Sequence, residues 1–492
     1  MIGKATPKWR IVPANGTIVL ILIGLTLAVR AQTFGNPFIG FDEQFYLLVG
    51  EQMLHGALPY VDIFDRKPIG LFLIFAGIRR LGGLGIVEYQ LTAAALAAAT
   101  GFGIYTLARR IAPWTGALAA AAAYVLWLDL TECEGGQAPV FFALPMVAAA
   151  LLVARAIERE HARSIAPLGA AAMFLTGIAM QIKYTALFEG VVFGLALLWS
   201  AWRNGERSAR LAALGLLWIL CALLPTALAA AYYAHLGQLP AFVFANFRSL
   251  GGRLPDPFSR RLIGLGTILL ILCPLLAFVQ PRLRDVTPLQ LFLTLWLAAA
   301  LLSIVGFGSW LAVHYAAPTL VPLTIAAAPA LARHRRAATG LLAFGLVAGQ
   351  VLIALNITHK GTRVQALALA AAAEPRSGGK LYVYNGPPAL YLLTGSPLPT
   401  RWPFPGHLNT ADEASAAAIG TDPTAEVRGI MASRPDTVVD TAPSYALGNS
   451  VTHAVLRKAL TRDYLLSFRQ ALPGGKLRLV YHLRLPSRSM RL

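Results

Sequence analysis

The sequence predicts a polytopic α-helical membrane protein with about 11 transmembrane helices, further helices at one membrane surface and a C-terminal α/β domain. Of the 492 residues, 57% are hydrophobic and only 13% are charged, which excludes an ordinary soluble enzyme. Apolar segments repeatedly approach the ~20 residues that a helix needs to cross a bilayer. After residue 357 these segments end, and Pro, Gly, Asp and Ser become more frequent, as in a water-soluble domain.

The predicted membrane spans alternate with short loops. They cover residues 14–31, 87–108, 112–128, 138–156, 165–182, 185–202, 211–234, 261–279, 286–307, 310–331 and 337–357. Lys and Arg gather in alternate loops, so the positive-inside rule places the N-terminus in the cytoplasm and, with an odd number of spans, the C-terminus outside. We expect the first span to be an uncleaved signal anchor, because no small-residue cleavage site is evident.

The formal charge of +19 does not indicate a nucleic-acid partner. The basic residues lie in short clusters between apolar segments and not along one face, so membrane topology explains them. The three cysteines, Cys133, Cys221 and Cys273, are far apart, and the sequence therefore predicts neither a disulfide framework nor a thiolate metal site.

Two further segments are predicted to be helices at the outer membrane surface. Pro68–Leu81 is apolar, but its length of about 14 residues is too short to span comfortably. If it did span, every later basic cluster would move to the outer side, so we interpret it as an interfacial or re-entrant helix. Gln44–Leu54 has apolar residues along one helical face and is interpreted in the same way.

The sequence divides into a transmembrane domain, residues 1–357 with its outer loop 32–86, and a soluble domain, residues 358–492. With ~130 residues, the soluble domain is large enough to have a core of its own. Short β-type runs and helical patterns predict its elements. The expected strands are Leu381–Tyr384, Thr437–Val439 and Leu477–His482, and the expected helices lie around 411–433 and 451–461.

The outer loop 32–86 is unusually rich in charge. It holds 5 of the chain's 23 acidic residues, namely Asp42, Glu43, Glu51, Asp62 and Asp65. A charged group at a membrane boundary costs free energy unless it is hydrated, forms an ion pair or has a function. We therefore interpret this loop as a candidate active site. The pair Asp42–Glu43 suits a general base or a metal site, and it equally suits the first turn of a helix, where acids favour the helix dipole.

Three basic residues are candidates for binding a lipid phosphate. Arg66 and Lys67 end the charged part of the loop. They could bind a phosphate, attract anionic headgroups nonspecifically, or form salt bridges with Asp62 or Asp65. Lys183 lies between two apolar spans with no acidic residue close by in the sequence. Two interpretations stay open: its ammonium group binds an anion, or the side chain simply extends to the membrane interface.

Two later outer segments add polar candidates. Glu132 and Glu134 lie in an acidic turn that suits sugar hydroxyls or a cationic group, and equally a solvated turn. His314 and Tyr315 lie near the outer end of the tenth span. They could contact the substrate, and a histidine at this place equally suits a structural hydrogen bond. Walker, dinucleotide-binding, HExxH and nucleophile-elbow motifs are missing, so a preactivated lipid donor fits better than nucleotide-driven chemistry.

These motifs resemble those of the GT-C glycosyltransferases, in particular the bacterial branch that includes lipid A aminoarabinose transferases and protein O-mannosyltransferase-like proteins. The matching motifs are Asp42-Glu43, Gly56-x-x-Pro59-Tyr60-x-Asp62, Lys67-Pro68, Glu132 to Glu134 and His314-Tyr315. Ile69 stands where family members usually have a second proline. The LYVYNGPPALYLLTGSPLPTRW stretch resembles the outer domain of bacterial members, so the resemblance covers nearly the whole chain.

The resemblance implies inverting transfer of a monosaccharide from a polyprenyl-phosphate donor to lipid A, O-antigen, another glycan or a protein at the periplasmic face of the bacterial inner membrane. Asp42 would be the base, and Glu43 would orient the donor or acceptor. Arg66, Lys67 and Lys183 would bind the donor phosphate. The expected substrate-binding residues are Tyr60, Asp62, Glu132, Glu134, His314 and Tyr315. The resemblance implies no cofactor or metal, but the acidic residues could bind a divalent metal ion.

Two other classes of function stay open at this point. A lipid-linked sugar transporter or flippase predicts charges along the midplane of the spans and two related halves. A non-catalytic subunit of an envelope glycan assembly predicts an acidic loop that tolerates neutral substitutions. A phosphoethanolamine-type transferase is disfavoured, because the soluble domain lacks an evident His, Asp and Thr metal constellation.

Overall fold

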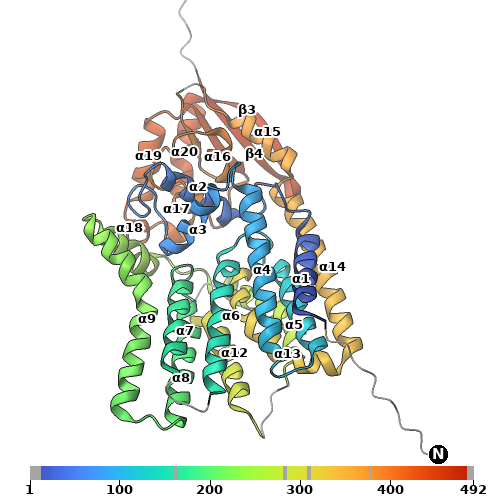
Figure 1. The fold of residues 1–492 in the computed structure, drawn as a ribbon. Helices are drawn as coiled ribbons and strands as arrows, with labels where there is room; N and C mark the ends of the chain where they lie inside the picture. Colours follow the sequence, from blue (N-terminus) through green and yellow to red (C-terminus); the bar gives the residue numbers. More distant parts are fainter. Residues whose placement is uncertain (1–12, 160–164, 281–284, 307–311, 377, 485–492) are drawn as a thin grey trace, which may run out of the picture.

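Long apolar helices form a bundle, and a smaller α/β domain lies at one end of it (Figure 1). The computed structural model describes residues 13–159, 165–280, 285–306, 312–376 and 378–484. The bundle helices are α1 (Asn15–Arg30), α4 (Ile86–Ala108), α5 (Trp114–Leu130), α6 (Ala138–Ile157), α7 (Ile165–Met180), α8 (Ala186–Arg203), α9 (Ser208–His235), α11 (Phe258–Leu276), α12 (Pro288–Gly306), α13 (Ala317–Arg333) and α14 (Arg335–Lys360).

The predicted polytopic fold is confirmed, and each predicted span falls on one bundle helix. Within the described ranges, 8 helical segments are long and apolar enough to cross a membrane. The other three predicted spans correspond to α1, α5 and α7, which are apolar but only 16, 17 and 16 residues long. The first residues of the predicted span 310–331 lie outside the described residues.

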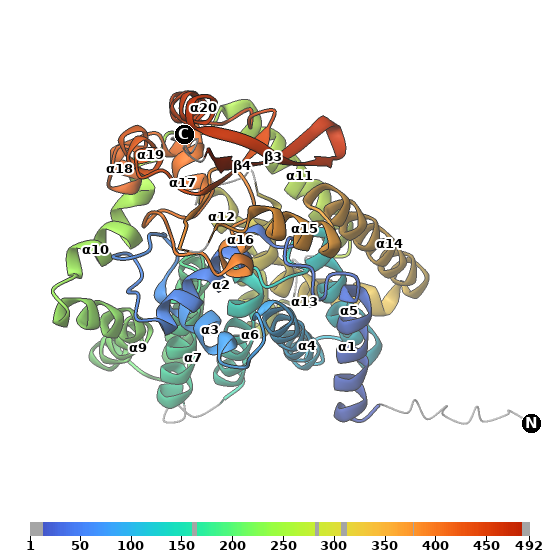
Figure 2. The ribbon, with the colours of Figure 1, turned by 90° about the horizontal axis from the view of Figure 1, so that it is seen from above.

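Two helices outside the bundle, α2 (Phe41–Leu54) and α3 (Ile69–Arg79), lie between the bundle and the α/β domain (Figure 1), and the view from above shows them over the ends of α6 and α7 (Figure 2). They pack against each other at Gly50, where a Cβ atom would stand 2.7 Å from the backbone nitrogen of Ala76. Residues 43–50 of α2 are buried on all sides, because α16 of the α/β domain covers the side away from α3. The helix predicted to have one apolar face is therefore enclosed between two parts of the protein.

Short helical elements line the same end of the bundle. Between α9 and α11 the chain forms α10 (Leu239–Val243), a π-helical turn η2 (Phe244–Arg248) and a 3₁₀ turn η3 (Ser249–Gly252). A further 3₁₀ turn, η4 (Val313–Ala316), precedes α13. η3 packs against α18 of the α/β domain, so this end of the bundle and the domain are in direct contact.

The C-terminal domain is built on a four-stranded sheet of order β1-β2-β4-β3, in which only the β1–β2 pair is parallel. The strands are β1 (Leu381–Val383), β2 (Thr437–Ala442), β3 (Tyr464–Leu472) and β4 (Lys476–Leu483). The helices and turns are α15 (Arg363–Ala373), α16 (Ala389–Thr394), α17 (Pro405–Asn409), η5 (Ala411–Glu413), α18 (Ala416–Ile419), α19 (Pro423–Ala432), α20 (Ser450–Asp463) and η6 (Pro473–Gly475).

Two expectations for this domain were wrong in detail. Strand β3 was not predicted; it pairs only with β4, and its exposed positions break the apolar pattern. The helix expected around 411–433 is instead three short elements. Gly420, with φ +78°, ends α18, and Asp422 begins α19 by accepting a hydrogen bond from the backbone nitrogen of Thr424 (2.9 Å).

Candidate active site

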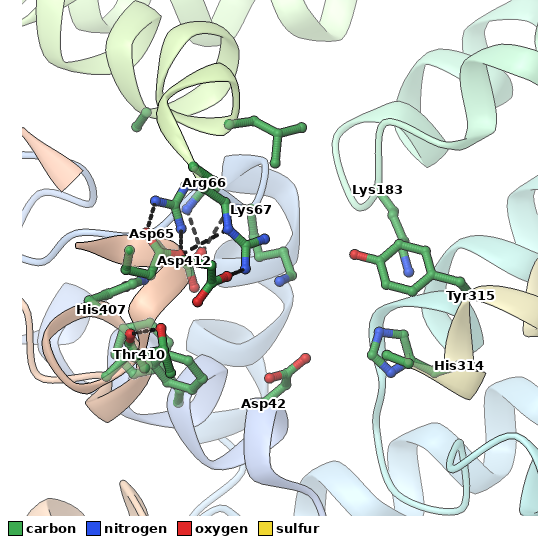
Figure 3. Close-up of a pocket in the computed structure, with 18 of the residues that line it drawn as sticks. Asp42, Asp65, Arg66, Lys67, Lys183, His314, Tyr315, His407, Thr410 and Asp412 are labelled. Carbon is green, nitrogen blue, oxygen red and sulfur yellow. Dashed lines mark hydrogen bonds and ion pairs between the residues drawn. The ribbon is translucent and has the colours of Figure 1, made fainter. Parts of the chain in front are cut away.

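A cavity of about 410 Å³ lies where the bundle end, α2 and the C-terminal domain meet (Figure 3). Separate segments on the bundle side contribute its charged and aromatic side chains. They are Asp42 from α2, Lys67 from the segment before α3, Lys183 from the loop between α7 and α8, and His314 and Tyr315 from η4. The fold thus brings together predicted site residues that lie far apart in the sequence.

Asp42 lies in the first turn of α2, and its carboxylate faces the cavity. Its Oδ2 accepts hydrogen bonds from Nε2 of Gln137 (3.1 Å) and the hydroxyl of Tyr46 (3.3 Å). Burial opposes ionisation, but the positive charge of Lys67 and the Gln137 hydrogen bond contribute to an opposing effect that lowers the pKa of the Asp42 carboxyl. The carboxylate is therefore ionised at neutral pH and able to accept a proton.

Lys67 and Lys183 line the cavity with ammonium groups that have no anionic partner among the described residues. The Nζ atom of Lys67 lies 5.7 Å from the centre of the Tyr46 ring, and that of Lys183 lies 4.2 Å from the centre of the Tyr315 ring. These cation–π contacts are weaker than a salt bridge and leave the ammonium hydrogens free for an anion.

The two ammonium groups differ in charge state. Burial disfavours the charged form of Lys67, but Asp65 and Asp42 outweigh it and raise its pKa. Lys183 is 8% exposed, and its burial together with the charge of Lys67 lowers its pKa to about 7. Lys67 is thus a fixed cation, whereas Lys183 is a cation that an incoming anion would stabilise.

His314 and Tyr315 form a stacked pair with ring centres 4.8 Å apart. Both residues line the cavity on the side of Lys183 (Figure 3). The predicted substrate-contact residues of η4 therefore lie beside the two lysines, in a position to contact a bound molecule.

Glu43 follows Asp42 in the sequence but does not line the cavity. It is 2% exposed, and its Oε1 accepts a hydrogen bond from the backbone nitrogen of Gly136 (3.2 Å). Burial and the negative charge of Asp42 raise the pKa of Glu43 to about 8. A protonated Glu43 that holds α2 against the 131–137 loop fits this placement better than the predicted contact with the donor or acceptor.

The acidic turn is also outside the cavity. Glu132 is exposed, with φ +53°. Glu134 is buried, accepts a hydrogen bond from Nδ2 of Asn356 in α14 (3.3 Å), and has its pKa raised by burial. Neither residue lines the cavity, and their expected contact with substrate stays a prediction.

Arg66 lines the cavity, but its guanidinium is occupied by protein partners. Nη1 donates to Oε1 of Glu413 (2.7 Å), Nη2 donates to the carbonyl of Ala418 (2.6 Å), and Nε donates to the hydroxyl of Ser249. The salt-bridge alternative therefore describes Arg66, although its partner is Glu413 of the C-terminal domain and not Asp62 or Asp65. The predicted phosphate-binding role of Arg66 stays a prediction.

Two further predicted substrate residues have local structural contacts. Tyr60 is 1% exposed and donates a hydrogen bond to the carbonyl of Lys67 (2.7 Å), so it fixes the backbone that carries this lysine. Asp62 is exposed, accepts from the backbone nitrogen of Leu58 (2.7 Å) and faces a different groove. Neither side chain lines the cavity, and the expected substrate contacts of Tyr60 and Asp62 stay predictions.

Sequence reasoning missed the residues that complete the cavity on the side of the C-terminal domain. They include Arg253, Phe404, His407, Thr410, Asp412, Glu413 and Tyr445. The signal available was weak: a run of aromatic and proline residues, WPFPGH, followed by the polar stretch LNTADE. In the described part of the chain, no three His, Cys, Asp or Glu side chains gather as a metal-binding group.

The fold and the cavity together define a class, namely a multi-pass membrane protein with the GT-C fold and a charged cavity beneath its C-terminal domain. Two crystal structures of ArnT from Cupriavidus metallidurans are similar to the chain. The one bound to undecaprenyl phosphate has a TM-score of 0.60 at 16% identity, and the apo one has 0.61 at 15%. In both, the match covers 95% of this chain and 98% of the other.

Residues 66–228 match the model of the dolichyl-phosphate-mannose-protein mannosyltransferase family. A comparison with curated protein sequences finds no match. The matches confirm the predicted resemblance to ArnT and to protein mannosyltransferases, and the structural matches show the shared fold.

Proposed function

We propose that the protein is an inverting glycosyltransferase that moves a monosaccharide from a polyprenyl-phosphate donor to an acceptor hydroxyl at the periplasmic face of the bacterial inner membrane. One observation carries this proposal: the ionised carboxylate of Asp42 shares one cavity with the ammonium groups of Lys67 and Lys183. A base for the acceptor and cations for the leaving phosphate are what such a transfer requires.

The reaction needs no further group from the protein. The acceptor oxygen attacks the anomeric carbon of the donor sugar while Asp42 takes the hydroxyl proton. The bond between the anomeric carbon and the phosphate oxygen breaks, and its electron pair stays on the phosphate. Lys67 and Lys183 stabilise the charge that the departing polyprenyl phosphate gains, so no general acid is required. Attack opposite the leaving group inverts the anomeric centre.

The donor class has independent support. One of the two similar ArnT structures holds undecaprenyl phosphate, and the matching family model is described by dolichyl-phosphate mannose. A cavity with two lysines that lack an anionic partner among the described residues suits the phosphate of such a lipid. We propose Lys67 as the fixed phosphate contact and Lys183 as the second one.

The proposed side of the membrane follows from charge. With the N-terminus in the cytoplasm, the basic clusters fall in the cytoplasmic loops, and the α/β domain and cavity face the periplasm. Lipid-linked sugars serve as donors where nucleotides are lacking. We further propose that the chain divides into two domains near the end of α14. The bundle and loop 32–86 carry the chemistry, and the C-terminal domain closes the cavity.

The test is transfer of label by the purified full-length protein in lipid nanodiscs. A panel of radiolabelled polyprenyl-phosphate monosaccharides is offered with envelope glycan and glycolipid acceptors, and products are separated by carrier. Asp42→Asn is the matched control, because it keeps the size and the Gln137 contact but cannot take a proton. Transfer by the wild type and loss in the variant are expected.

The same preparations test the alternative classes. Movement of an intact donor across a proteoliposome membrane without change of carrier would identify a flippase and overturn the proposal. Equal complementation of a deletion strain by the wild type and Asp42→Asn, with no transfer by either, would identify a non-catalytic subunit and overturn it as well.

A further inference from the structure

The cavity has two walls of different composition. The bundle wall carries Lys183, while Lys67 lies across the cavity beside Arg66, and neither ammonium group has an ion-pair partner in the described ranges (Figure 3). The opposite wall comes from the C-terminal domain and the segment before α11, and it includes Phe404, His407 and Thr410. A ligand that bridges the cavity would meet Lys183 on one side and the aromatic and polar groups around His407 on the other.

The arginines on the domain wall are already neutralised. Arg66 forms a two-pronged ion pair with Glu413, and Arg253 lies 3.1 Å from a carboxylate oxygen of the same Glu413. Arg253 also pairs with Asp412. Because each guanidinium has a carboxylate partner, this wall offers no free positive charge from the arginines and does not favour a second anion.

His407 provides a polar group on the domain wall that has no partner in the protein. The residue is 4% exposed, and its ring packs against the rings of Phe64 (5.1 Å), Phe404 (5.2 Å) and Phe45 (6.2 Å). Neither ring nitrogen forms a hydrogen bond within the described chain, and Nδ1 is fully enclosed. Burial, together with the nearby charge of Arg66, lowers its pKa far below the usual value, so the imidazole is neutral.

A neutral imidazole among aromatic rings suits a sugar. Because Nδ1 is enclosed, the other ring nitrogen, Nε2, is the one available to a ligand, and in a neutral imidazole it forms one hydrogen bond with a hydroxyl, as donor or as acceptor. The flat apolar side of a pyranose packs on aromatic rings such as Phe404, and a pocket with aromatic walls and few polar groups fixes its orientation. An unpaired buried polar group is costly, so a ligand that pairs it gains affinity.

We propose that the C-terminal domain provides the acceptor subsite, in which His407 hydrogen-bonds a hydroxyl of an uncharged glycan while the sugar ring packs on Phe404. This inference rests on the proposed function, since it assigns the second substrate of the same reaction. It predicts that the enzyme glycosylates a neutral sugar hydroxyl and not a phosphate-bearing one, because the two arginines on this side are paired with carboxylates and do not select for negative charge.

The first experiment uses His407→Phe in the full-length protein in nanodiscs. Phenylalanine fits among three phenyl rings and removes only the two nitrogens. We expect the KM for the acceptor to rise about tenfold, the effect of one lost hydrogen bond, and to rise several times more than the KM for the donor. His453→Phe is the matched control, since His453 is in the same domain but does not line the cavity. His407→Gln, which keeps a hydrogen-bonding group, should cause a smaller rise and covers the case in which the Phe variant does not fold.

The second experiment offers the wild type alkyl-linked neutral oligosaccharides and the same molecules carrying one ring phosphate. At least about tenfold better use of the neutral members is expected. Preference for the phosphorylated members, or an unchanged acceptor KM in both His407 variants, would overturn the acceptor subsite while leaving the proposed transfer intact. If the wild type transfers sugar from no polyprenyl-phosphate donor to any acceptor, the proposed function itself fails.

Discussion

Two pairs of basic residues line the same cavity and differ in whether they form ion pairs within the protein. The lysine pair, Lys67 and Lys183, faces the cavity without an anionic partner among the described residues. The arginine pair, Arg66 and Arg253, lies a few ångströms from carboxylates of the C-terminal domain. Both pairs are partly or largely buried, so exposure alone does not distinguish them.

The difference indicates which charged residues bind a ligand and which stabilise the fold. Burial and the charge of Lys67 lower the pKa of Lys183, so its charged form is unfavourable in the protein until an anion arrives, whereas Asp65 and Asp42 raise the pKa of Lys67 without forming an ion pair with it. The ion pair of a buried arginine offsets the free-energy cost of removing its charge from water, and here it joins the outer loop to the C-terminal domain. Substitutions should therefore separate the pairs: changes at the lysine pair affect turnover, and changes at the arginine pair affect stability.

The largest effect is expected at Asp42, the one carboxylate that faces the lysine pair from α2. Asp42→Asn should lower transfer by about 10³-fold, within the range for a lost general base. Glu43→Gln should keep most of the activity, because this carboxyl is protonated at neutral pH and lies outside the cavity. Initial rates with both substrates saturating measure this contrast. Equal losses in the two variants would mean that the acids act as one unit.

The second largest effect is expected at Lys67. Lys67→Met removes a fixed cation next to the leaving phosphate and should lower kcat/KM for the donor by about 100-fold. Lys67→Arg keeps the charge but changes its shape, so part of the activity should remain. The donor concentration dependence of each variant provides the measurement. A loss confined to acceptor dependence would place Lys67 elsewhere in the reaction.

Lys183 should give the reaction a pH dependence. Its pKa is lowered to about 7 by burial and by the charge of Lys67, so it is a cation below this pH and neutral above it. The charged fraction falls about tenfold between pH 6 and pH 8, and the KM for the donor should rise by a similar factor. Asp42 does not contribute, because its pKa is lowered and it stays ionised over this range.

Lys183→Arg isolates this effect, since a guanidinium keeps its proton throughout the range. Its donor KM should be nearly constant between pH 6 and pH 8. If the wild type shows no rise, or if the arginine variant keeps the full rise, another group is responsible for the pH dependence.

The bundle could be predicted from the sequence because its signal is local. A long apolar segment such as Ala138–Ile157 must be a helix in lipid, since no other backbone arrangement satisfies its own hydrogen bonds there. Strand β3 was missed for the opposite reason. It is an edge strand that pairs only with β4, and its stability comes from that partner and not from its own pattern.

The site was predictable only where a charge stood out against an apolar background. Asp42, Lys67 and Lys183 were predicted in this way, because charge is costly at a membrane boundary, and the structure places all three at one cavity. His407 was not predicted, since nothing in its neighbours along the chain indicates that the α/β domain reaches the cavity. The ion pair of Arg66 with Glu413 could not be predicted, because Glu413 lies far away in the sequence and only the fold brings the two residues together.

The smallest effect on turnover is expected for the Arg66–Glu413 pair, and it tests the comparison directly. Arg66→Met leaves Glu413 with Arg253 alone, and Glu413→Met leaves Arg66 without its carboxylate, so each should lower the midpoint of thermal unfolding by about 5 °C. The double variant replaces both charges by apolar groups and should recover part of this loss. Its transfer rate at a temperature where it is folded should stay within a few-fold of the wild type. A rate loss in the double variant as large as that of Lys67→Met would show that Arg66 acts on the donor, and the distinction between the two pairs would then fail.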